Sequence, residues 1–244
     1  MIASPRRTLV TGASRPLGVE FVRQCLDRGD RVIAAARNPA RVPVLADLRA
    51  KYGALDLLAL DPADAASVAE AMPVLEQITQ SLDLVIVAPA EPGPHDRASD
   101  AARDAALETL SATGLVEHYR RHAVAPVLLV RTLLPLLEAA GKARVLLVNS
   151  WLASLGGKSY GGDYAVCASG AGYNMLARAL AHDVATFNVI VGIGNPGKFA
   201  PTPDTSPTSV PIEQSVAGLL SVIEGMSAER SGDFADWSGA AREW

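Results

Sequence analysis

The stretch RTLVTGASRPLGVEFVRQCLDRG, residues 7–29, decides the fold of this chain. It begins with a short apolar and β-branched run, which is typical of a buried strand. Apolar side chains then recur at helical spacing through Leu17, Phe21 and Cys25, and Gly29 ends the helix. A strand, a glycine turn and a helix in this order predict the first half of a βαβ unit.

The same alternation of strand and helix patterns continues along the chain. It predicts a Rossmann-type α/β fold, a doubly wound parallel sheet with helices on both faces. With 244 residues and 49% hydrophobic composition, we expect a single domain, residues 1–244. The further strands are expected at residues 31–37, 54–60, 82–88, 143–149 and 188–194, with a short one at 233–237, and long helices at 64–82 and 114–141.

Charge and hydropathy exclude several partner classes. The net charge is −4 and the pI is near 5.6, which argues against a nucleic-acid-binding surface. The longest apolar run, residues 124–137, contains Arg131 and two prolines and is too short for a membrane span. No signal-peptide pattern follows the N-terminal arginines, so we expect a cytoplasmic protein. Cys25 and Cys167 lie far apart in apolar helical patterns and are predicted to be buried free thiols.

The turn TGASRPLG, residues 11–18, is a candidate dinucleotide site. Glycines allow a tight turn close to a pyrophosphate, and the N–H groups at a helix start attract the anion. Pro16 weakens this prediction because proline has no N–H to donate. The alternative is that the chain retains the glycine turn as part of its fold but binds no dinucleotide. Residues of the turn that we expect to contact the cofactor are Gly12, Ser14, Arg15, Leu17 and Gly18.

Two further residues bear on which cofactor would bind. Arg37 follows the second predicted strand and, with Arg15, suits a ribose 2′-phosphate, which favours NADP over NAD. Asp61 follows the third strand, where an adenine contact could form. The Pro- and Thr-rich loop at residues 195–211 lies beyond the sixth strand and is a candidate lid, with a plain surface loop as the alternative. Glu91 and His95, after the fourth strand, could add to the same pocket or be merely solvated.

These motifs together resemble the short-chain dehydrogenase/reductase family, and within it the C-factor-like members. The likeness extends from RTLVTGAS through VNS, GGDYAVCASGAGYNMLARALA and NPG to SGDFADWSGAAREW. The family's catalytic set is Asn, Ser, Tyr and Lys, and each is transferred here only position by position. Ser150 matches the serine, His122 occupies the asparagine position, and Val166 and Gly170 replace the tyrosine and the lysine. Residues 87–90, VAPA, replace the family's NNAG motif.

The missing pair changes the expected chemistry. Ketone reduction needs a proton on the oxygen, and the family supplies it from a tyrosine whose pKa a lysine lowers. Valine and glycine cannot do this, so we expect little turnover of ordinary ketones. His122 near Ser150 could instead act as acid or base, although a helix histidine bonded to the backbone is commoner. His118 and His122 have a metal-binding spacing, but no third ligand is indicated, so no metal site is expected.

Three functions remain open at this point. The first is non-redox chemistry on a small, largely apolar molecule, such as cyclisation, isomerisation or dehydration. The second is an atypical NADP-dependent oxidoreductase. The third is a non-catalytic binding or scaffold partner. The resemblance also implies a homodimer or homotetramer built on the long helices, including the helix that starts near Ala165.

Overall fold

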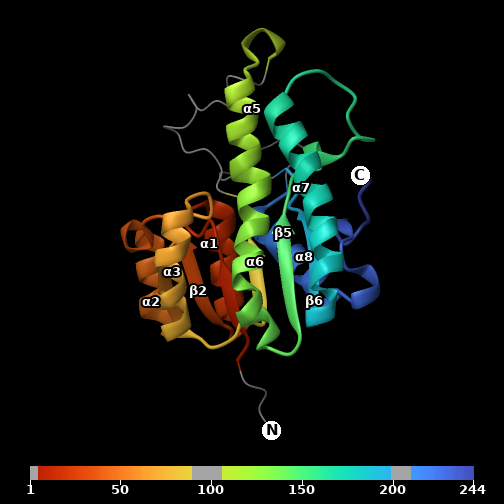
Figure 1. The fold of residues 1–244 in the computed structure, drawn as a ribbon. Coiled ribbons are helices and arrows are strands. Elements are labelled where there is room, and N and C mark those ends of the chain that lie inside the picture. Colours follow the sequence, from red (N-terminus) through yellow and green to blue (C-terminus); the bar gives the residue numbers. More distant parts are fainter. Residues whose placement is uncertain (1–4, 90–105, 199–209) are drawn as a thin grey trace.

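A computed structural model describes residues 5–89, 106–198 and 210–244, and within them the predicted α/β sheet is confirmed. Its seven strands are all parallel, in the order β3-β2-β1-β4-β5-β6-β7 (Figure 1). All seven predicted strands form, and each end lies within two residues of its predicted position. The strands are β1 Arg7–Val10, β2 Arg31–Ala36, β3 Leu55–Ala59, β4 Leu84–Val87, β5 Ala143–Val148, β6 Val189–Asn195 and β7 Phe234–Asp236.

Helices cover both faces of this sheet and form two apolar cores. One core lies between the sheet and α3, α6 and α7, and the other lies under α1, α2 and α8. The helices are α1 Pro16–Asp27, α2 Pro43–Tyr52, α3 Ala65–Ile78, α5 Ala112–Tyr119, α6 Ala125–Glu138, α7 Tyr164–Asp183 and α8 Ile212–Glu224. Short 3-10 turns are η1 Pro39–Arg41, η3 Leu107–Thr109, η5 Trp151–Ala153, η6 Val184–Phe187 and η7 Ala228–Arg230. Among the helices of the described segments, none is long and apolar enough to cross a bilayer.

The helix predicted at residues 114–141 is interrupted. A π-helical segment, η4 Arg120–Val124, joins α5 to α6, and His122 lies within it. Such wide turns are rare and occur often at functional sites. In Figure 1, α5 and the first half of α7 lie side by side beyond the end of the sheet. The prediction of two buried thiols is correct for Cys25 but wrong for Cys167, which is partly exposed because it lies at the first turns of α7 in that projecting part.

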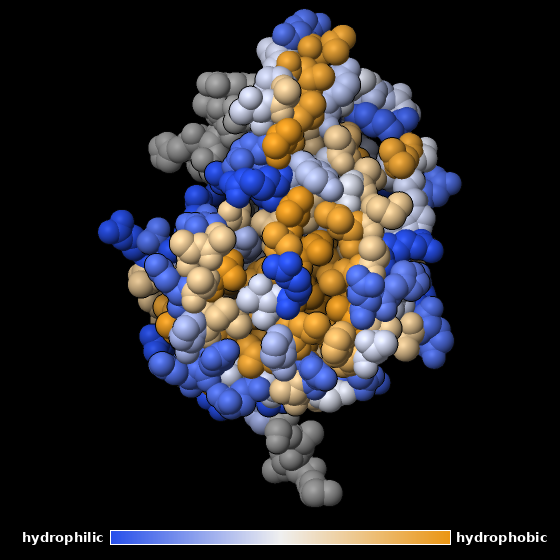
Figure 2. Space-filling model, in the orientation of Figure 1, coloured by the Kyte–Doolittle hydropathy of each residue, from blue (hydrophilic) through white to orange (hydrophobic). Residues whose placement is uncertain are grey.

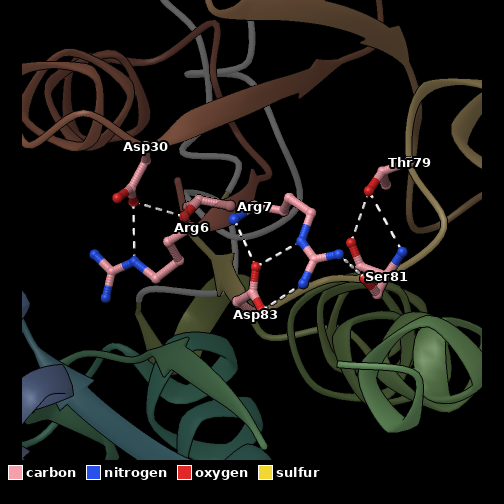
Figure 3. Close-up of polar contacts among 7 residues, drawn as sticks. Arg6, Arg7, Asp30, Thr79, Ser81 and Asp83 are labelled. Atoms are coloured by element: carbon pink, nitrogen blue, oxygen red, sulfur yellow. Dashed lines mark hydrogen bonds and ion pairs between the residues drawn. The ribbon is translucent and has the colours of Figure 1, made fainter. Parts of the chain in front are cut away.

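The opposite end of the sheet is fastened by an ionic network (Figure 3). The Arg7 guanidinium binds both carboxylate oxygens of Asp83, at 2.7 and 2.8 Å, and also contacts the Ser81 hydroxyl. Arg6 bonds Asp30 at 3.1 Å, and Thr8 Oγ1 donates to the same carboxylate at 2.7 Å. These bonds hold β1 between its two neighbours at their amino ends, leaving the carboxyl ends to build the site.

Candidate functional site

The first βα turn keeps the shape that a dinucleotide site needs. Gly12 has φ +63°, and a Cβ there would lie 2.9 Å from the Ala88 carbonyl oxygen. At Gly18, a Cβ would lie 2.2 Å from the Gly12 carbonyl oxygen, so α1 packs directly on the turn. Both positions therefore require glycine. Pro16 is the first residue of α1, where the missing N–H breaks no helical bond, so the turn tolerates it.

The other cofactor candidates lie at the carboxyl ends of their strands, as predicted. Ser14 and Arg37 are exposed, Arg15 is the N-cap residue of α1, and Leu17 is buried in its first turn. Asp61 follows β3, where its Oδ1 accepts a bond from Ala63 N at 3.0 Å. Thr11 Oγ1 donates to Ala88 O at 3.3 Å, which ties the turn to the segment after β4. Strands β1 and β4 flank the point where the strand order reverses, the usual ligand site of such sheets.

Two parts of this site have the chemistry to hold NADP(H), namely the start of α1 and the side chain of Arg37. The first-turn N–H groups of α1 have no acceptor in their own helix and would receive a pyrophosphate. Arg37 makes no ion pair with any residue in the described segments, so its guanidinium is available to a 2′-phosphate. Glu91 and His95 lie outside the described residues, as does most of the candidate lid at 195–211.

Gly170, which the family resemblance aligns with the catalytic lysine, lies in a closely packed contact. Gly170 of α7 is buried against η5, and a Cβ there would lie 2.9 Å from Ala153 Cβ and 3.1 Å from Ala153 Cα. Asn149 Nδ2 donates to the Gly170 carbonyl at 2.9 Å and to Asn174 Oδ1 at 2.6 Å. This contact of helix with loop leaves no space for a longer side chain at position 170. Val166, at the tyrosine position, is partly buried and carries no polar side-chain atom.

Ser150 follows β5 and begins η5. Its Oγ accepts a bond from Leu152 N at 3.2 Å, so its hydroxyl hydrogen can still be donated to a ligand oxygen. Asn149 Oδ1 accepts the Ser150 N–H at 2.9 Å and so fixes the backbone of the serine. Sequence reasoning missed Asn149; the only signal was a polar side chain at the carboxyl end of a strand.

His122 stacks on His118 with ring centroids 4.0 Å apart. His118 Nδ1 lies 2.8 Å from Ser169 Oγ on α7, so this pair is held against the helix. Burial, followed by the charges of His118 and Arg121, lowers the pKa of His122 to about 4. At neutral pH the imidazole is therefore uncharged, and it is a weaker base than an ordinary histidine. No hydrogen bond joins His122 to Ser150 in the described segments, and their cooperation stays a prediction.

No group of three or more His, Cys, Asp or Glu side chains suited to a metal occurs within residues 5–89, 106–198 and 210–244.

A pocket of about 460 Å³ opens beyond the carboxyl ends of β6 and β7, next to η5. Five of its lining residues belong to the candidate lid at 195–211, whereas the contributions of Trp151, Gln214, Asp236, Trp237 and Arg242 were not predicted. The lining residues are Trp151, Asn195, Gly197, Lys198, Val210, Pro211, Gln214, Asp236, Trp237 and Arg242.

Most of the chain matches one known protein family. The profile of the family described as short chain dehydrogenase matches residues 6–209. The chain belongs to the short-chain dehydrogenase family. This confirms the resemblance drawn from the motifs and relates the chain to oxidoreductases.

Three proteins of known name are similar to the chain at 26–29% identity. The C-signal protein of Myxococcus xanthus is 29% identical over 139 residues, which are 57% of this chain and 84% of that protein. A 1-hydroxy-2-glutathionyl-2-methyl-3-butene dehydrogenase of Rhodococcus sp. (strain AD45) is 27% identical over 97% of this chain and 98% of its own. The crystal structure of an NADPH-bound carbonyl reductase from chicken fatty liver matches with a TM-score of 0.86, at 26% identity, over 98% of this chain and 99% of that one.

Proposed function

We propose that the protein is an atypical NADP(H)-dependent oxidoreductase of a small carbonyl compound, in which no tyrosine–lysine pair delivers the proton. The first βα turn carries this proposal. Its two required glycines and the free start of α1 are retained although Pro16 interrupts the usual motif. The similarity to carbonyl reductases and dehydrogenases supports redox chemistry over the non-redox alternatives.

The chain's own residues would bind and orient the reactants. When bound, NADPH would supply the hydride. The first-turn N–H groups of α1 would bind the pyrophosphate, and Arg15 and Arg37 the 2′-phosphate. Ser150 would donate its hydroxyl hydrogen to the substrate oxygen, and the bond that its backbone N–H donates to Asn149 Oδ1 would hold the serine in place. The proton itself would come from water or from the substrate, because Val166 and Gly170 cannot supply it.

A second candidate is the cofactor-independent conversion of a small molecule, with His122 as base. The place of His122 in the π-helical segment supports this candidate, whereas its pKa of about 4 makes the imidazole a weak proton acceptor at neutral pH. A non-catalytic binding role is the third. The three functions make different predictions for nucleotide binding and turnover.

The test is a calorimetric titration of nucleotide-free protein with NADPH and NADH, followed by NADPH oxidation on a panel of ketones. We expect micromolar NADPH binding, with NADH at least about tenfold weaker. Arg37→Ala should weaken NADPH about tenfold and leave NADH unchanged, whereas Arg49→Ala, an exposed arginine on α2, should change neither. Ketone reduction should be about 10²–10⁴-fold slower than that of a family member with both catalytic residues.

The outcomes separate the candidates. Absence of NADPH binding at millimolar concentration overturns the proposal and favours the cofactor-independent reaction. NADPH binding with no oxidation on any carbonyl favours the binding role. A turnover as fast as that of the intact family member would show that another residue delivers the proton.

A further inference from the structure

The pocket beyond β6 and β7 has a rigid polar floor. Asn195 is buried, its Oδ1 accepts bonds from Trp151 N and Gly197 N, both at 3.1 Å, and its Nδ2 donates to Asp236 Oδ2 at 3.1 Å. One side chain thus fixes η5, the end of β6 and the end of β7 around the same space. A pocket held in this way is preformed, as ligand sites usually are.

Two tryptophans line this pocket. Trp237 lies against Gly197 and Gly218, where a Cβ would come within 2.9 Å of the indole Cδ1 and 2.1 Å of the Trp237 carbonyl oxygen, respectively. The absence of side chains at both glycines therefore makes room for this tryptophan. Trp151 lines the pocket from η5, immediately after Ser150. Flat aromatic side chains with a fixed position favour a ligand with a ring.

The described lining residues carry an excess of one positive charge. Lys198 and Arg242 are cationic, and Asp236 is the one anion among the lining residues that the structure describes. Asp236 is already engaged, because it accepts bonds from Asn195, from Ser238 N at 3.3 Å and from Arg242 Nη1 at 3.4 Å. The pocket therefore favours a ligand that carries a single negative charge.

Arg242 is only partly satisfied by its neighbours. Its side-chain bond to Asp236 is long, at 3.4 Å, and its buried Nε has no acceptor among the described residues. Because Nε has no surface that a ligand in the pocket can reach, the carboxylate would be bound by the terminal amino groups of the guanidinium. The backbone bond from Arg242 N to Phe234 O at 2.9 Å holds the residue beside β7. A guanidinium fork fits the two oxygens of a carboxylate.

The start of α8 adds to the attraction for an anion. Pro211 and Gln214, at this start, line the pocket, and no side chain from the described segments caps the helix. The positive end of the helix dipole thus faces the same space. Lys198 is positioned nearby, because its carbonyl accepts a bond from Val210 N at 2.9 Å.

We propose that this pocket binds a small ring compound with one carboxylate, with its ring between Trp151 and Trp237 and its carboxylate at Arg242 and Lys198. As the substrate class of the enzyme, this assignment rests on the proposed oxidoreductase function. Binding of the carboxylate itself does not, because the pocket is formed without any nucleotide. An experiment can therefore contradict the carboxylate site without contradicting the oxidoreductase function, and the reverse.

The experiment compares 3-phenylpropanoate with its neutral isostere 3-phenylpropanamide, by calorimetric titration of the nucleotide-free protein at pH 7. We expect the acid to bind at least about tenfold more tightly than the amide. Arg242→Gln should remove this preference by weakening the acid about tenfold while leaving the amide unchanged. Arg49→Gln serves as the matched control and should keep the preference.

Equal binding of acid and amide to the wild type would overturn the proposal, as would absence of binding by both at millimolar concentration. Retained preference in Arg242→Gln would also overturn it. If Arg242→Gln does not fold, Lys198→Gln on the exposed rim should reduce the acid preference by a smaller factor, and the wild-type comparison still decides. Titration with NADPH on the same samples shows separately whether the nucleotide proposal holds.

Discussion

At Gly170, a single missing side chain brings α7 into contact with the loop after β5. The nearest atoms, Cβ and Cα of Ala153, would lie 2.9 and 3.1 Å from an added Cβ. The packing around Gly170 therefore leaves no space for the lysine that the family resemblance would place at this position. Restoring a lysine here would require α7 and η5 to move apart.

We predict that Gly170→Ala destabilises the protein by about 1–2 kcal/mol. Overpacking costs about 1–3 kcal/mol, and the helix preference of alanine returns up to about 1 kcal/mol. Adding Ala153→Gly should recover part of the loss, which a double-mutant cycle by urea unfolding would measure. Gly225→Ala is the control, because its Cβ would meet atoms no closer than 3.6 Å. A stabilised Gly170→Ala protein would contradict the packing argument.

Some properties of single residues could be predicted from the sequence and others could not. The positions of Ser150, Val166 and Gly170 were predicted from the motifs around them. The lowered pKa of His122 could not be predicted, because it depends on burial and on the ring of His118 stacked against it. Asn149 and Arg242 were missed because their roles arise only when separate elements meet.

At the scale of elements, β1 depends on ionic contacts at its amino end. Arg7 donates to Asp83 from its backbone N–H at 2.7 Å as well as from its guanidinium, so β1 is joined to the residue before β4 (Figure 3). Burial would raise the pKa of Asp83, but these bonds outweigh it and hold the pKa below its usual value of 3.8. The strand that precedes the glycine turn is thereby fixed in register.

We predict that Asp83→Asn lowers stability at pH 7 by about 1–2 kcal/mol, between the cost of an exposed ion pair and that of a buried one, because this pair is partly buried. Because the folded pKa is depressed, the contribution is present above the unfolded pKa and is lost as pH falls through the folded pKa. The difference between wild type and variant in urea unfolding should therefore shrink as pH falls below about 4. Asp233→Asn, in an exposed pair with Arg230, should cost about 1 kcal/mol or less. An equal difference at pH 7 and pH 3 would contradict the ionic role.

The order of elements was predictable because strand runs, glycine turns and helical spacing agree along the chain. The π-helical segment Arg120–Val124 was not, since the apolar spacing of residues 114–141 reads as one regular helix. The bulge is decided by packing of α5 and α6 against α7, a contact between distant segments. The same holds for the pocket, whose walls come from η5, β6, β7 and α8.

The molecule as a whole exposes an apolar face on the long helices α5, α6 and α7. Figure 2 shows hydrophobic side chains gathered along the middle and the projecting end of the face that carries α5, α6 and α7. Val116 and Met175 are 66% and 69% exposed, and Leu128 is 42% exposed. The ring of Tyr119 packs onto Gly172, so α5 and α7 present one continuous surface. Exposed apolar surface of this kind marks an interaction site.

We predict that two copies of the chain associate through this face and that the protein is at least a dimer in solution. A stable dimer buries about 800 Å² on each partner, and two helices and their flanking side chains supply a surface of that order. Light scattering after gel filtration should give twice the chain mass or more for the wild type at micromolar concentration. Val116→Lys with Met175→Lys should give monomers, because both charges would be buried unpaired at the contact. Leu155→Lys, at an equally exposed apolar residue in the loop before α7, should leave the assembly unchanged. A monomeric wild type, or an assembly that survives both lysines, would place the interface elsewhere or remove it.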